Sequence, residues 1–266
     1  VKEYLDIMDH RKTEQLIDTL DKVEQNRKEC YIREFSIEHF HDSKIFETLI
    51  PKICKIFREE NEELTGFENE EILAEYQIYK TPGYVYMKGN VQIYSAGKQA
   101  ADISAFPEGI AVAVGSEEDT PDICPDQTID KVFTIENLTS FYRFKQEHSL
   151  VIYLGGYHNR SRRNLLMQIY QKLPDAQYYH FGDLDAGGFY ILEHLKRKTG
   201  IPFQMFQMDI ETLKKYEDYA KPLTENDKKR LMQLEKMELP DEERKLITYM
   251  LQKGIKLEQE CISESQ

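Results

Sequence analysis

The 266-residue sequence contains only four cysteines, which are widely separated and form no C-x-x-C pair. This spacing argues against a cysteine-based zinc site and favours free, mostly buried thiols in a reducing cytosol. No stretch approaches the ~18 consecutive apolar residues of a membrane span, and the N-terminus lacks the apolar core of a signal peptide. The sequence also begins without methionine, so we expect a fragment of a longer protein.

Positive charge is scarce, since 35 Lys and Arg stand against 48 Asp and Glu and the net charge is −13. Such an average argues against a nucleic-acid partner, because phosphate repels an acidic protein. The charge is unevenly distributed, however. Residues 129–200 hold ten Lys and Arg against seven Asp and Glu, a local charge of +3 that leaves −16 for the rest. The middle of the chain is therefore electrostatically unlike its flanks.

Residues 1–128 are expected to form a mixed α+β N-terminal region with a hairpin and a linker. Helices are predicted within residues 1–30 and from Ser43 onward, a β-hairpin over residues 84–95 and a buried strand at 110–114. The helices follow from the spacing of apolar residues, with Pro51 marking a kink or a fresh start. The hairpin follows from Gly89-Asn90 between two apolar runs. The acidic segment 116–127, with two prolines, is predicted to be a domain boundary.

Beyond residue 129 the pattern changes to alternating strands and helices. Strands are predicted at 131–135, 150–154, 177–182 and 202–208, and helices at 138–146, 162–173 and 189–200. This alternation is typical of an α/β fold with a mostly parallel, Rossmann-like sheet and flanking helices. We therefore expect an α/β core over residues 129–210. Residues 211–266 are expected to form a C-terminal helical extension, with Thr224 and Pro240 as helix starts.

Three acids follow predicted strands of this core. Glu136 comes directly after the strand at 131–135, and Asp183 and Asp185 follow the strand at 177–182. Functional groups of open α/β sheets gather at the carboxyl ends of the strands, so we expect these carboxylates to converge. Converging carboxylates repel one another unless a cation neutralises them, and all-oxygen ligation suits Mg²⁺ or Mn²⁺.

The aspartates alone also have a structural explanation. An aspartate is a favoured N-cap, and the predicted helix at 189 begins nearby. Gly187 and Gly188 would permit a sharp turn into that helix and leave room for a phosphate or a metal-bound water. Taken with Glu136, these glycines favour a metal site over a simple cap.

Several separated motifs together resemble a known family. TIEN (134–137) followed by GDLDAGGF (182–189) resembles the Toprim domain of topoisomerases, bacterial primases and some nucleases. The longer segments REFSIEHFHDSKIFE (33–47), VFTIENLTSFYRF (132–144), YLGGYHNRSRRNLL (153–166), HFGDLDAGGFYIL (180–192) and KLEQE (256–260) resemble the JetD family of bacterial Wadjet plasmid-defence systems. That family is itself similar to the A subunit of topoisomerase VI.

The resemblance implies a metal-dependent DNA endonuclease in the bacterial cytoplasm. It further implies double-stranded DNA as substrate, a condensin-like ATPase complex as partner and, by analogy with topoisomerase VI, a homodimer. Glu136, Asp183 and Asp185 carry over as the catalytic, metal-binding acids. The sequence leaves open whether Glu136 is a metal ligand or mainly a general base.

A basic segment after the second strand of the core is a candidate for contacts to DNA phosphate. It contributes His158, Arg160, Arg162 and Arg163 at the same edge of the sheet. The alternative is that the arginines cover a helix face and pair with acids. His180, within a predicted strand, is interpreted as a core histidine.

Two other functions are weighed against the nuclease. The first is a DNA-binding or assembly subunit that keeps the Toprim fold but does not cut, which the acidic flanks would support through a basic partner. The second is a phosphatase of the haloacid dehalogenase type, whose D-x-D also ends a strand. It fits poorly, because Gly187 stands where that motif usually has Thr or Val.

Overall fold

The computed structural model describes residues 10–61, 64, 67–80, 83–114, 121–155 and 160–262. The chain divides into two compact units, Val1–Gly83 and Tyr84–Gln266. The units therefore divide well before the predicted boundary at residue 128. No helix among the described residues is both long enough and apolar enough to cross a bilayer.

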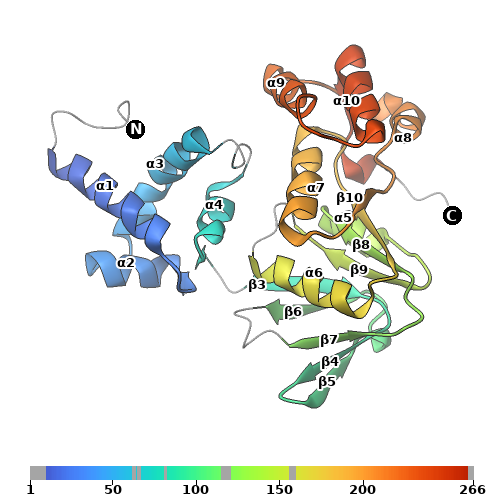
Figure 1. Cartoon of the computed structure of the whole chain (residues 1–266), viewed down its shortest axis with the longest axis horizontal. Coiled ribbons are helices and arrows are strands. Elements are labelled where there is room, and N and C mark those ends of the chain that lie inside the picture. Colours follow the sequence, from blue (N-terminus) through green and yellow to red (C-terminus); the bar gives the residue numbers. More distant parts are fainter. Residues whose placement is uncertain are drawn as a thin grey trace. The chain divides into compact units, whose positions relative to one another are not determined.

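The first unit is mainly helical. It contains α1 (His10–Gln25), α2 (Ile32–Phe40), α3 (Ile45–Glu60) and α4 (Asn69–Glu75), with a short parallel pair of β1 (Cys30–Tyr31) and β2 (Ile78–Tyr79) (Figure 1). The apolar positions predicted from Ser43 onward lie on one buried face of α3, which includes Phe46, Ile53 and Phe57. Pro51 lies inside α3, so it does not mark a fresh helix start.

The second unit is built on a six-stranded sheet. Its order is β11-β10-β8-β9-β3-β6, comprising β11 (Gln204–Met205), β10 (Gln177–Phe181), β8 (Lys131–Ile135), β9 (Ser149–Tyr153), β3 (Gly83–Lys88) and β6 (Ile110–Val114). The four strands from β11 to β9 pair in parallel, and β3 runs antiparallel to β9. The connecting helices are α5 (Leu138–Arg143), α6 (Arg160–Lys172) and α7 (Ala186–Thr199). The predicted α/β alternation is therefore confirmed.

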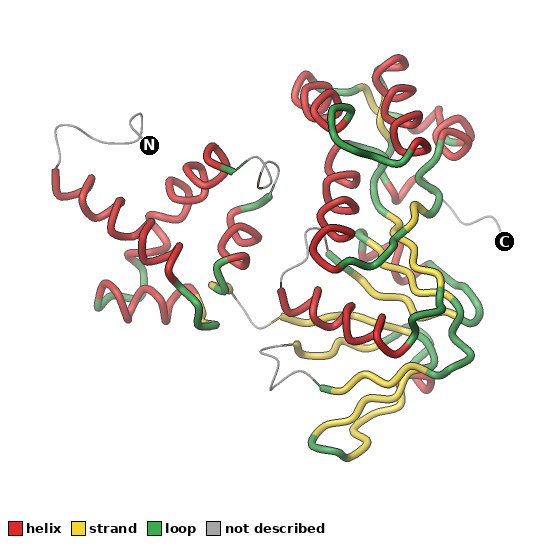
Figure 2. The backbone as a smooth tube through the Cα atoms, viewed as in Figure 1, coloured by secondary structure: helices red, strands yellow, loops and turns green. Residues whose placement is uncertain are grey.

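The predicted hairpin over residues 84–95 is wrong, because its two strands belong to different sheets. Strand β4 (Val91–Ser95) pairs instead with β5 (Lys98–Asp102) and with β7 (Asp122–Pro125) (Figure 2). Gly89 has a φ of +138°, and a Cβ there would lie 2.5 Å from the carbonyl oxygen of Ser149. The glycine thus serves a close approach to β9, after which the chain crosses to the second sheet.

Two further expectations for this region need correction. Strand β6 is buried only at alternate positions, with Val112 and Val114 inside and Ala111 and Ala113 exposed. Part of the segment predicted as a boundary forms strand β7, which pairs with β4. Asp122 and Pro125 are therefore the end residues of a strand.

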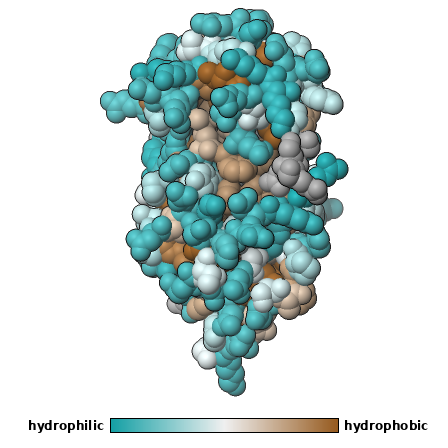
Figure 3. Space-filling view, turned by 90° about the vertical axis from the view of Figure 1, so that its right-hand side faces the viewer, coloured by the Kyte–Doolittle hydropathy of each residue, from teal (hydrophilic) through white to brown (hydrophobic). Residues whose placement is uncertain are grey.

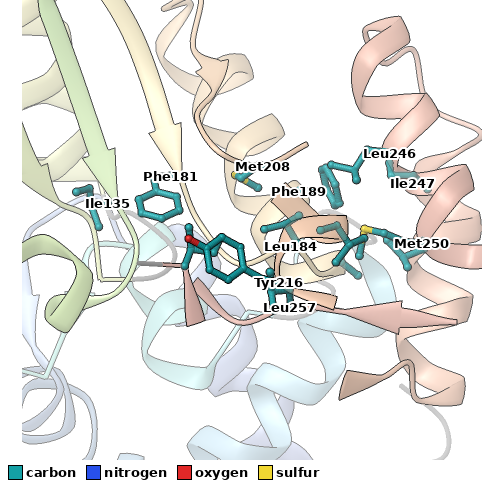
Figure 4. Close-up of a cluster of buried hydrophobic side chains, with 14 of the residues drawn as sticks. Ile135, Phe181, Leu184, Phe189, Met208, Tyr216, Leu246, Ile247, Met250 and Leu257 are labelled. Carbon is teal, nitrogen blue, oxygen red and sulfur yellow. The ribbon is translucent and has the colours of Figure 1, made fainter. Parts of the chain in front are cut away.

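The C-terminal segment is helical, as predicted, and shares the core of the sheet. It contains α8 (Ile210–Lys215), α9 (Glu225–Leu234), α10 (Asp241–Lys253), the pair β12 (Lys221–Pro222) and β13 (Ile255–Lys256), and the short 3₁₀ helix η5 (Gln259–Cys261). Thr224 caps α9 and Pro240 precedes α10, so both predicted starts are confirmed. Leu246 and Met250 of α10 join the same buried cluster as Phe181 (Figure 4). On the side of the molecule that Figure 3 shows, most of the surface residues are hydrophilic.

Candidate functional site

The structure brings Glu136 next to the segment that carries Asp183. Strands β8 and β10 are parallel neighbours, with Ile135 opposite Phe181. The segments that follow the two strands therefore leave the sheet at the same edge. The backbone N–H of Glu136 donates to the Phe181 carbonyl at 3.0 Å. In return, Oε2 of Glu136 accepts from the backbone N–H of Asp183 at 3.4 Å. The two segments therefore meet at this edge, through the Glu136 carboxylate and the backbone of Asp183. Convergence of all three carboxylates stays a prediction.

Gly182 makes room for this arrangement. A Cβ at this position would lie 2.6 Å from Oε2 of Glu136 and 2.8 Å from Nε2 of His180. Any side chain at residue 182 would thus displace the Glu136 carboxylate or the histidine ring. The sequence analysis did not assign this role to Gly182. A glycine directly before the D-x-D motif was the signal that could have indicated a close approach there.

Asp185 caps helix α7, as the structural explanation of the motif anticipated. Its Oδ1 accepts from the backbone N–H of Gly188 at 2.9 Å. A Cβ at Gly188 would lie 2.2 Å from the carbonyl oxygen of Asp183, whereas one at Gly187 would lie 3.0 Å from Oδ1 of Asp185. The turn that presents both aspartates therefore depends on a glycine at position 188.

Asp183 is half-buried and lies among other carboxylates. Its Oδ1 accepts from the backbone N–H of Gln259 at 2.7 Å. Burial raises the pKa of Asp183 to about 6, and Asp185, Glu260 and Glu258 add to the rise, although the Gln259 hydrogen bond opposes it. Negative charge is thus concentrated at this edge, and a cation would offset it.

Segment 256–260 contributes two further acids, Glu258 and Glu260. Oε1 of Glu260 accepts from Nδ2 of Asn137, the residue after Glu136, at 2.5 Å. Glu258 is instead paired with Lys221 at 2.5 Å. Of these two acids, Glu260 is the one that hydrogen-bonds to the segment that carries Glu136.

The residues present fit an oxygen-liganded cation in their chemistry. Within the described ranges, no three His, Cys, Asp or Glu side chains are gathered into a ready-made metal cluster. Glu136 and Asp183 nevertheless supply carboxylate oxygens from adjacent strand ends, which is the donor type that Mg²⁺ and Mn²⁺ prefer. Asp185 is the third candidate ligand, and one of its oxygens is engaged in capping α7.

The candidate DNA-binding residues are only partly described. His158 lies outside the described residues, as does the side chain of Arg160 at the start of α6. Arg162 donates through Nη1 to the Leu154 carbonyl at 2.8 Å, and Arg163 is only 8% exposed. Both charges therefore lie against the fold, as expected if the arginines cover a helix face. A contact with DNA stays a prediction.

His180 is a core histidine, as interpreted from the sequence. It is fully buried, and its Nδ1 lies 3.0 Å from Oγ1 of Thr134. Burial, with a smaller contribution from Lys196, lowers its pKa to about 3, so the ring is neutral. Its Nε2 has no hydrogen-bond partner among the described residues.

A small cavity lies beside Glu260 and the end of strand β10. Its volume is about 150 Å³, and it lies between α5 and the C-terminal segment, with Arg143, Ser140 and Glu260 among its lining residues. The Arg143 side chain is exposed, so it can meet an approaching anion. This arginine was not singled out from the sequence, because nothing in its local motif distinguishes it from other surface cations.

Comparisons with known proteins agree with the resemblance noted in the sequence. Residues 119–266, more than half of the chain, match the family model described as "Wadjet protein JetD, C-terminal". The "Wadjet protein JetD" of Bacillus cereus (strain Q1) is 29% identical over 264 residues. That match covers 97% of this chain but 63% of the relative, so the chain spans less than two thirds of the relative's length. The chain therefore belongs to the JetD family and contains the family's C-terminal region.

Proposed function

We propose that the chain is the cutting part of a metal-dependent DNA endonuclease with a Toprim-type site. The observation that carries the proposal is the contact between the Glu136 carboxylate and the backbone of Asp183, at the carboxyl edge of a parallel sheet. The Glu136 carboxylate is thereby held against the backbone that carries Asp183, at neighbouring strand ends. Carboxylates from neighbouring strand ends are suited to hold the Mg²⁺ or Mn²⁺ that would assist phosphodiester hydrolysis.

The candidate residues would have different roles in the reaction. A bound Mg²⁺ or Mn²⁺ would supply positive charge to the scissile phosphate and acidify a water. Glu136 and Asp183 would hold the cation through carboxylate oxygens. Asp185 fixes the turn by capping α7, whose N-terminal end also favours nearby negative charge. Glu136 serves as the general base in the alternative assignment, in which Asp183 and Asp185 bind the cation.

The proposed substrate is double-stranded plasmid DNA, and the proposed partner is a condensin-like ATPase complex of a Wadjet system. The name of the Bacillus cereus relative supports the Wadjet assignment. Through that complex the chain would act on closed circular DNA, and as a homodimer it would present two sites.

Metal removal gives the first test. Supercoiled plasmid incubated with the chain and Mn²⁺ or Mg²⁺ is expected to be nicked or linearised, because the cation offsets the carboxylate charge at the site. EDTA should stop cleavage, and excess Mn²⁺ should restore it. Cleavage that continues unchanged in EDTA would contradict the proposal.

A non-cutting DNA-binding or assembly subunit is the second candidate. One observation favours it: each of the three acids accepts a backbone N–H, so all three also stabilise the local fold. In that case Asp183→Ala should lower the stability of the chain but leave the DNA binding and the plasmid-cleavage assay of the folded protein unchanged. Loss of cleavage in this variant, with DNA binding retained, would favour the nuclease.

Arg143 is expected to contact DNA phosphate from the rim of the small cavity. Arg143→Ala should weaken DNA binding severalfold and reduce the slope of log affinity against log salt by about one. Fluorescence anisotropy at several salt concentrations measures both. Lys98→Ala, which removes an exposed cation from strand β5, is the matched control. Equal losses in both variants would point to a general charge effect.

A further inference from the structure

Gln259 is completely enclosed at the edge of the candidate site. It opens the short helix η5, and it is 0% exposed. A buried amide costs free energy unless its oxygen and its nitrogen both find hydrogen-bond partners. The partners that Gln259 finds belong to the two segments that carry the candidate acids.

Three hydrogen bonds join Gln259 to those segments. Its Oε1 accepts from the backbone N–H of Asn137 at 2.8 Å. Its Nε2 donates to the carbonyl of Phe181 at 3.0 Å. Its backbone N–H donates to Oδ1 of Asp183 at 2.7 Å. One residue therefore holds the position after Glu136, the end of β10 and the first aspartate of the motif.

The segment around Gln259 is itself anchored to the motif. Leu184 and Leu257 exchange both backbone hydrogen bonds, at 2.9 and 3.1 Å, in an isolated antiparallel bridge. Their side chains are buried in the same cluster (Figure 4). Glu260 adds its contact with Asn137 on the other side. The residues on both sides of Gln259 are thus attached to the segments that carry the candidate acids.

We propose that Gln259 is a positioning residue that fixes the carboxylates of Glu136 and Asp183 relative to each other. An amide is needed because it donates and accepts at the same time, whereas a carboxylate only accepts and an apolar side chain does neither. The inference deepens the proposed function, since these two acids are the proposed cation ligands. The positioning itself does not depend on a bound cation.

Gln259→Met tests the proposal, because it keeps the side-chain length and the backbone N–H but removes the amide. Strands β8 and β10 should stay paired, but the Asp183 N–H should lose its 3.4 Å contact with Oε2 of Glu136. Amide hydrogen exchange at Asp183, followed by NMR, should accelerate about tenfold or more. The Mn²⁺ concentration for half-saturation should rise about tenfold or more, as for other residues that orient metal ligands.

Leu246→Ala is the matched control, because it weakens the same hydrophobic cluster from helix α10. Compared at equal loss of stability, it should not accelerate exchange selectively at Asp183. Equal exchange at Asp183 in the two variants would overturn the positioning role, as would wild-type Mn²⁺ affinity in Gln259→Met. If the wild-type chain binds no Mn²⁺, the proposed function fails, and exchange at Asp183 still decides the role of Gln259.

Discussion

Replacing Glu136 by Gln or Asp183 by Asn is expected to reduce metal-dependent plasmid cleavage by about 100-fold or more, the scale of losing one electrostatic group from an active site. Both substitutions keep a side-chain oxygen that can accept the hydrogen bond from the backbone N–H of Asp183 or Gln259. The fold should therefore survive. What is lost is the negative charge that holds a cation.

Asp183→Asn should also unfold at a temperature no lower than the wild type at pH 8. The charged carboxyl is disfavoured by burial and by the neighbouring acids, which raise its pKa to about 6, and a neutral amide removes that repulsion. Exposed Asp175 provides the control, since Asp175→Asn changes the same charge away from the site. Wild-type cleavage rates in Glu136→Gln and Asp183→Asn would contradict the assigned site.

Gly188→Ala is expected to lower the free energy of unfolding by about 2–4 kcal/mol, the range of severe steric substitutions. The new Cβ would lie 2.2 Å from the carbonyl oxygen and 3.1 Å from the carbonyl carbon of Asp183. Backbone atoms cannot rotate away as a side chain can, so the loop that carries Asp183 must move. Urea denaturation measures the stability, and plasmid cleavage should fall with it.

Gly187→Ala is the matched control for Gly188→Ala. Its Cβ would approach only side-chain atoms of Asp185, the nearest being Oδ1 at 3.0 Å, so the cap of α7 must give by a few tenths of an ångström but no backbone atom must move. Both variants gain the same helix propensity of about 1 kcal/mol. Gly187→Ala should therefore stay within about 1 kcal/mol of the wild type. Equal stability of the two variants would show that the close approach at position 188 is not rigid.

The α/β core was predictable because its signals are local. Short apolar strands alternate with amphipathic helices after residue 129, and few arrangements other than a parallel sheet accommodate that alternation. The same logic placed Glu136 and the two aspartates at one edge. Strand ends meet there whatever the details of the loops, and Glu136 and Asp183 do lie in contact.

The hairpin prediction failed because strand pairing is decided at long range. Gly89-Asn90 carries the signal of a two-residue turn. The glycine is nevertheless required by Ser149, a residue of β9 that lies 60 positions away in the sequence. Backbone contacts of this kind leave no mark in the local pattern, so the partners of β3 and β4 could not be inferred from their own residues.

The outer parts of the site were invisible for the same reason. Gln259 lies 76 positions from Asp183 and 122 from Asn137. A glutamine near the end of a polar, helical segment looks like a surface residue until the fold encloses it. The reverse holds for Arg163, for which the sequence left open a contact with DNA or a place on a helix face, and whose side chain is buried.

Mn²⁺ binding, measured by electron paramagnetic resonance on the wild-type chain and on Glu136→Gln and Asp183→Asn, tests the central claim most directly. The account predicts saturable binding to the wild type, weakened about tenfold or more in both variants and unchanged in Asp175→Asn. No saturable binding to the wild type, or equal binding to all four chains, would contradict the claim that Glu136 and Asp183 jointly hold a catalytic cation.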